Sequence, residues 1–223
     1  IERKQSNRLY NYLALAAKDF DAICEKKTLP KVGVVGEIYL KFNSFAHRNI
    51  VDWFVEQKIE VDPPILLNFF LQSFVNRKSK LQSNIEEKRF SDLFMNVFFK
   101  IVQSQISKVN KATSAFKYFT PFNTDIFKES EKVKTIVPLN AQFGEGWLLP
   151  AEIISYVENG VTHIVSLQPF GCIANHIVSK GVEKRIKDLY PNVYLLSLDF
   201  DSGVSDVNIK NRLLLFIDKL KKL

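Results

Sequence analysis

Two short, nearly continuous apolar runs most strongly limit what this chain can fold into. THIVSLQPF (residues 162–170) and NVYLLSLDF (192–200) have the length of strands but lack the polar alternation of a half-exposed strand. Such runs are typical of central strands in a parallel sheet whose two faces are both covered by helices. We expect one helix between them, at about 174–190, and another after them, at 208–220.

Two further strands are predicted earlier in the chain. KVGVVG (31–36) and IEVDPP (59–64) flank a loop and then a helical segment at about 45–58, and this spacing favours a right-handed parallel crossover. An amphipathic helix is expected at 7–26, before the first strand. Apolar residues at helical spacing then predict a helical insertion at about 65–120, and a further helix is expected at 147–157.

These elements predict an α/β fold, Rossmann-like or flavodoxin-like, with a parallel sheet of about four strands flanked by helices. We expect a single domain over residues 1–223 with the insertion at about 65–120. The chain does not begin with Met, and Met95 is its only methionine, so we expect it to be excised from a longer multidomain protein.

Composition limits the cellular compartment and the classes of binding partner that we expect. No apolar stretch approaches the roughly 20 residues that cross a bilayer, so no membrane partner is predicted. Cys24 and Cys172 do not have the spacing of a disulfide framework, which favours a reducing, cytoplasmic setting. The net charge of +7 is spread over helical segments, as at Lys180, Lys184 and Lys187, and no nucleic-acid-binding motif occurs, so no nucleic-acid partner is expected.

Four polar, glycine-marked segments are candidates for a ligand site. In an open parallel sheet, ligands bind beyond the carboxyl ends of the strands, where helix N-termini offer free N–H groups. GEIYLKFN, QPFGCIANH and DFDSGVSD each follow a predicted strand, and QFGEGW (142–147) opens the helix before the third strand. The GEG of this last segment is too short for a dinucleotide fingerprint, and no Walker loop is present, so ATP binding by that route is excluded.

Particular residues in these segments carry the predicted chemistry. Glu37 directly follows the first strand, where it can exchange a proton or a hydrogen bond with a ligand, and His176 is the second catalytic candidate. His176 can equally serve as a helix cap or a core group. Helix capping is the expected role of Asp206. The residues predicted to bind a ligand or cofactor are Gly144, Gly146, Gly171 and Asp201.

Cys172 has two interpretations on the residues alone. Proline and glycine in QPFGC fix a tight turn, and the cysteine lies just before a helix, whose positive dipole end favours a thiolate that can bind iron or attack carbon. The alternative is a small buried residue at a crowded turn.

Four segments in this order, GEIYLKFNSFAHRNI, QFGEGWLLPAEI, QPFGCIANHIVSKG and DFDSGVSDVNIKNR, give the chain a family resemblance. It resembles the C-terminal part of the acyl-CoA dehydratase activase-related proteins, which are similar to fusions of an ATP-dependent activase with a 2-hydroxyacyl-CoA dehydratase-like module. The match covers about residues 32–212 and is weakest in the helical insertion.

This resemblance implies low-potential electron transfer to an acyl-CoA substrate. In such systems an activase hydrolyses ATP to push one electron onto an iron–sulfur cluster of a dehydratase-like partner, so Cys172 becomes a candidate iron ligand. A [4Fe–4S] cluster ordinarily takes four ligands. Cys24 belongs to no recognisable ligand motif, so the other ligands and the activase ATPase are expected outside this chain.

The chain departs from the family pattern at one turn. CIANH stands where relatives are expected to read CLPNH, so the turn lacks a second proline, which bears on its rigidity. The alternative function is a non-catalytic scaffold or small-ligand-binding module in which Cys172 only packs.

Overall fold

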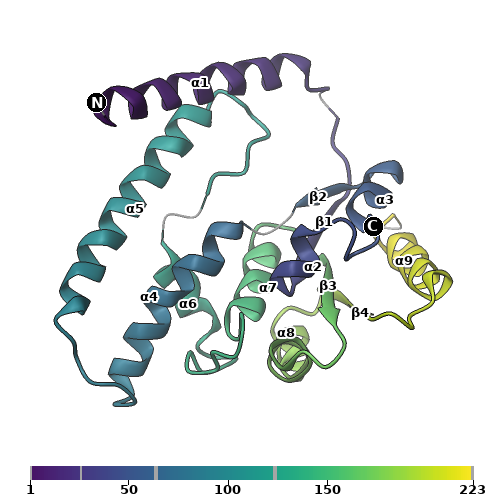
Figure 1. Ribbon diagram of the computed structural model, residues 1–223. Coiled ribbons are helices and arrows are strands. Elements are labelled where there is room, and N and C mark those ends of the chain that lie inside the picture. The colour runs from purple at the N-terminus through teal and green to yellow at the C-terminus, as the bar shows by residue number, and fades with distance from the viewer. Residues whose placement is uncertain (1, 26, 63–64, 123–124, 222–223) are drawn as a thin grey trace. The chain divides into compact units, whose positions relative to one another are not determined.

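The computed structural model describes residues 2–25, 27–62, 65–122 and 125–221 (Figure 1). The chain divides into two compact units, a helix-pair unit of residues 1–28 and 83–126 and a sheet unit of residues 29–82 and 127–223. The predicted helical insertion is shared between them. Helix α4 (Leu66–Gln82) belongs to the sheet unit and α5 (Ser91–Thr113) to the helix-pair unit.

The sheet unit contains an all-parallel sheet, which confirms the predicted α/β fold. Its strands among the described residues are β1 (Lys31–Gly36), β2 (Glu60–Asp62), β3 (His163–Pro169) and β4 (Tyr194–Phe200), in the order β2-β1-β3-β4. The predicted second strand ended at residues 63–64, which lie outside the described residues. Because β2 and β4 lie on opposite sides of the β1–β3 pair, the direction of winding reverses between β1 and β3.

Helices cover both faces of this sheet (Figure 1). On one face, α3 (Ile50–Glu56) and α9 (Asp206–Leu220) pack on the strands. The buried apolar core there includes Val32, Val34, Ile50, Phe54, Val165, Leu167, Leu198, Leu213 and Phe216.

The other face carries α7 (Leu148–Glu158), the π-helix η1 (Ala174–Ser179) and α8 (Glu183–Leu189). Gly33 of β1 lies directly under Tyr156 of α7, because a β-carbon at position 33 would approach the ring to 2.9 Å. β3, at the centre of the sheet, is therefore buried on both sides, as the apolar run at 162–170 predicted. The run at 192–200 was also predicted to be central, but β4 lies at the edge of the described sheet, and only alternate residues towards its end are fully buried.

Three helical segments differ from the sequence prediction. A single helix was expected at about 174–190, but the chain forms a π-helix, a short break and then α8. A short helix, α2 (Ile38–Phe42), follows β1 where a loop was expected, and α6 (Ile126–Val133) was not predicted. π-Helical turns are rare and are frequent at functional sites.

The helix-pair unit contains α1 (Glu2–Ile23) and α5. The Tyr10 hydroxyl donates to Gln105, and the amide of Lys117 donates to Asp21 at 3.0 Å. These two contacts join α1 to α5 and to the segment that follows α5. No helix in the described residues is long and apolar enough to cross a membrane.

Candidate functional site

The candidate site lies where the winding of the sheet reverses, at the carboxyl ends of β1 and β3, here called the β1–β3 edge. Open α/β sheets bind ligands at this position. Gly36 ends β1 with a φ of +133°, and a β-carbon there would lie 1.9 Å from the Leu167 carbonyl oxygen. Only glycine lets the two strands end this close together.

Glu37 follows at this edge and has a local structural role. Its amide donates to the Leu167 carbonyl at 2.9 Å, and its carboxylate accepts from the Leu40 amide at 3.0 Å, which caps α2. The side chain is half-buried. One carboxylate oxygen is thus used by the cap, and the predicted catalytic role stays a prediction.

The QFGEGW loop lies beside this edge. Gly144 and Gly146 both have positive φ, +59° and +43°, and a β-carbon at position 146 would lie 2.0 Å from the Ala141 carbonyl oxygen. A β-carbon at position 144 would lie 3.3 Å from that of Ala174, which begins η1. The two glycines therefore shape a loop that packs against the helix after Cys172, and their predicted part in binding a cofactor stays a prediction.

Glu145, between these glycines, is a candidate that sequence analysis missed. The residue is 3% exposed, and its Oε1 accepts from the Ile38 amide at 2.6 Å. Burial raises the pKa of Glu145 above its ordinary value, although the positive charge of Lys41 acts in the opposite direction. Its position between two glycines was the available signal, and a perturbed carboxyl at a sheet edge is typical of functional sites.

A buried ion pair lies next to Glu145. Lys41 Nζ contacts both carboxylate oxygens of Glu152, at 3.0 and 3.2 Å, with side chains 2% and 5% exposed. Burial raises the pKa of Glu152, and the charge of Lys41 opposes that shift. Two buried carboxyl groups therefore share one buried ammonium group. The signal in the sequence was that glutamate is the only charged residue in LLPAEIISYV.

The turn after β3 presents Cys172 at the same edge. Gly171 has a φ of +78°, and the Cys172 amide donates to the Pro169 carbonyl at 3.2 Å. Cys172 is partly exposed, and its Sγ accepts a hydrogen bond from Nδ2 of Asn175 at 3.2 Å. Asn175 is fully buried, and sequence analysis missed it. The roles predicted for Gly171 in cofactor binding and for Cys172 as a metal ligand are untested by this geometry.

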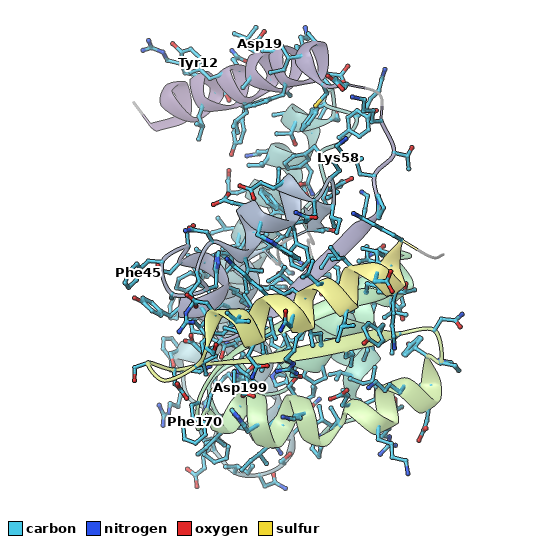
Figure 2. All side chains as sticks on the ribbon, turned by 90° about the vertical axis from the view of Figure 1, so that its right-hand side faces the viewer. Tyr12, Asp19, Phe45, Lys58, Phe170 and Asp199 are labelled. Carbon is cyan, nitrogen blue, oxygen red and sulfur yellow. The ribbon has the colours of Figure 1, made fainter. Side chains whose placement is uncertain are left out.

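His176 ties this turn to β4. Its Nδ1 lies 3.2 Å from the Cys172 carbonyl oxygen, and its Nε2 lies 2.9 Å from Asp199 Oδ1. Gln168 also donates to Asp199 Oδ1, at 2.6 Å. Asp199 lies on β4 and is labelled in Figure 2. Because both ring nitrogens face acceptors, His176 has a positioning role here, and its predicted catalytic role stays a prediction.

The acidic turn after β4 is held by Arg48. The guanidinium donates to the carbonyls of Val204 and Asp201, at 2.9 and 3.1 Å, and pairs with the Asp206 carboxylate. Asp201 Oδ1 accepts from the Gly203 amide at 2.6 Å, so this predicted cofactor-binding carboxylate takes part in a local turn. Asp206 does not cap α9, since Ser205 holds the cap position and Asp206 is the first helical residue.

A cavity of about 130 Å³ lies beside this turn, between α3 and α9. Arg48, Trp53, Asp206 and Lys210 are among its lining residues. None of the predicted site residues lines this cavity.

The predicted residues thus separate into groups. The amide of Ile38, next to Glu37, donates to Glu145 of the QFGEGW loop. Gly144 of the same loop packs against Ala174, which follows the Cys172 turn. Asp201 is instead tied to Arg48. Within the described residues, no cluster of three or more His, Cys, Asp or Glu side chains is arranged to hold a metal ion.

Comparisons of the chain with protein families, with curated proteins and with solved structures found no match.

Proposed function

We propose that the chain is a dehydratase-like module of an ATP-dependent iron–sulfur electron-transfer system that acts on acyl-CoA or similar substrates. The module is inactive alone and is part of such a system rather than a complete enzyme. The observation that carries the proposal is Cys172, which is partly exposed at the β1–β3 edge and whose sulfur accepts a hydrogen bond from a buried amide. The family resemblance of the four segments supports it.

The chemistry of Cys172 fits one ligand of a shared cluster. A thiolate is the form that binds iron, and hydrogen bonds to the sulfurs are among the features that tune iron–sulfur clusters. Since the described part of the chain offers no further metal-binding cluster, a [4Fe–4S] cluster would take Cys172 from this chain and its remaining ligands from another domain or subunit. The bound cluster would supply the one-electron chemistry.

The remaining residues and partners follow from this proposal. Glu37 and His176 are the candidate acid–base groups toward the acyl-CoA substrate, and Gly144, Gly146, Gly171 and Asp201 would bind the substrate or cofactor. The required partner is an activase ATPase domain or subunit. Cys24 and Cys172 are both free thiols, which fits the reducing cytoplasm as the compartment.

The test is anaerobic iron and sulfide analysis, with visible absorption spectra, of the natural protein that contains this chain. We expect Cys172→Ser to lose or alter the cluster absorption, because serine removes one thiolate ligand. Cys24→Ser is the matched control and should leave the cluster intact. A Cys172→Ser protein with unchanged iron content and spectrum contradicts the assignment.

A metal-free module that binds a small ligand is the second candidate. The buried Lys41–Glu152 pair and the raised pKa of Glu145, both at the β1–β3 edge, favour it, because such groups can recognise a polar ligand without iron. Calorimetric titration of the iron-free chain with an acyl-CoA separates the candidates. The metal-free module is favoured by two results together. The acyl-CoA binds the Cys172→Ser chain as it binds the unsubstituted chain, and Cys172→Ser leaves the cluster of the longer protein unchanged.

A further inference from the structure

Asn175 is buried in a way that packing alone does not explain. Its side chain is fully buried in η1, and its Nδ2 donates to Cys172 Sγ at 3.2 Å. Its Oδ1 is buried and has no hydrogen-bond partner among the described residues. An unpaired buried oxygen destabilises the fold, and an apolar side chain would avoid that cost. The contact that offsets it is the one from Nδ2 to the sulfur.

The surrounding residues hold this contact in place. The ring of His176 links the Cys172 carbonyl to Asp199, and Gln168 donates to the same carboxylate. Gln168 is also fully buried, and its Oε1 has no partner in the part of the chain that the structure describes. Cys172 is therefore held at its backbone by His176 and at its sulfur by Asn175, while the residue remains partly exposed.

We propose that Asn175 is a positioning residue for the Cys172 sulfur, and that its amide makes this sulfur readier to bind a metal ion or to react with an electrophile. A hydrogen bond to a thiolate is stronger than one to a thiol, because the acceptor is charged. The inference deepens the proposed function, since it concerns the same sulfur.

The experiment measures the rate at which iodoacetamide alkylates Cys172 in the folded, iron-free chain near neutral pH. Cys24→Ser is the background, so that only one thiol reacts. We expect Cys172 to react about tenfold more slowly in Asn175→Ala, because the thiolate loses a charge-assisted hydrogen bond. Equal rates in the two proteins would overturn the proposal.

Asn192→Ala is the matched control: Asn192 is exposed in the turn before β4, so its substitution should leave the alkylation rate unchanged. If Asn175→Ala does not fold, as judged by circular dichroism, NMR of the unsubstituted chain decides. The resonances of the two side-chain amide protons of Asn175 should then shift unequally when Cys172 is alkylated, because one of these protons points at the sulfur. Equal or absent responses would count against the proposal.

The iron-free assay also separates this inference from the proposed function. If the cluster persists in Cys172→Ser, the sulfur is not an iron ligand and the proposed function is contradicted. The alkylation result for Asn175 does not depend on that outcome. Conversely, equal alkylation rates remove the role of Asn175 while Cys172 can still be tested as an iron ligand.

Discussion

Substitution of either Lys41 or Glu152 should destabilise the sheet unit, because each leaves the charge of the other buried without a partner. Removing one partner of a buried ion pair leaves the other as an uncompensated buried charge, which costs about 3–5 kcal/mol. We expect Lys41→Met to lower the free energy of unfolding by about this amount near neutral pH. The loss should shrink as the pH falls, because Glu152 can then take up a proton. Urea denaturation at two pH values measures both effects.

Two variants control this prediction. Lys180→Met changes an exposed lysine and should shift the free energy of unfolding by less than about 0.5 kcal/mol. Lys41→Met combined with Glu152→Leu should recover part of the lost stability, because no charge is then left buried. A double variant that is as unstable as the sum of the two single variants would show that the pair is not coupled.

At the scale of elements, the closeness of β1 and β3 depends on Gly36. An added β-carbon would overlap the Leu167 carbonyl, and the φ of +133° is strained for any other residue. We expect Gly36→Ala to destabilise the chain by more than about 2 kcal/mol. Gly181→Ala is the control, because a β-carbon at position 181 meets nothing within 4 Å. Thermal or urea unfolding that shows equal losses for both variants would contradict the prediction.

The strands were predictable because each is a short apolar run between turn-forming residues. The predicted ranges for β1, β3 and β4 agree with the observed bounds to within about two residues. The π-helix was not predictable, since its first turn is held by contacts outside the local sequence pattern. His176 is held by Asp199, which lies on the next strand.

The candidate site was predictable only where local backbone chemistry marks it. Glycines with positive φ at positions 144, 146 and 171 fell in segments selected for their turn residues. Lys41, Glu145, Glu152 and Asn175 were missed because burial gives them their significance, and burial depends on tertiary packing. Lys41, for example, was assigned to a loop, whereas it lies on α2 with its ammonium group against α7.

At the scale of the whole chain, helical periodicity identified helices but not their partners. Residues 65–120 read as one insertion, yet α4 packs within the sheet unit, where Asn76 accepts from the Trp147 indole at 2.7 Å. In contrast, α5 pairs with α1, which lies almost a hundred residues earlier in the sequence. A pairing of that separation is set by side-chain contacts that a local pattern does not contain.

The dependence of stability on pH is a property of the whole chain, and two buried histidines contribute to it. Burial lowers the pKa of both His47 and His163 below the ordinary value of 6.5. Below pH 6.5 the unfolded chain therefore binds protons that the folded chain does not. These groups make the free energy of unfolding fall as the pH decreases from 6.5 toward their folded pKa values.

His163→Phe tests this contribution, because the ring lies between Tyr194 and Phe216, at 5.5 and 5.6 Å between centroids, where phenylalanine can pack without titrating. The raised pKa values of Asp62 and Glu145 act with the opposite sign, since stability falls as the pH rises through them. Asp62 and Glu145 are present in both the variant and the unsubstituted chain, so their contributions cancel in the difference between the two free energies of unfolding. We expect the advantage of the variant over the unsubstituted chain to grow as the pH falls below 6.5, as measured by urea denaturation. Parallel stability curves would show that His163 titrates alike in the folded and unfolded chains.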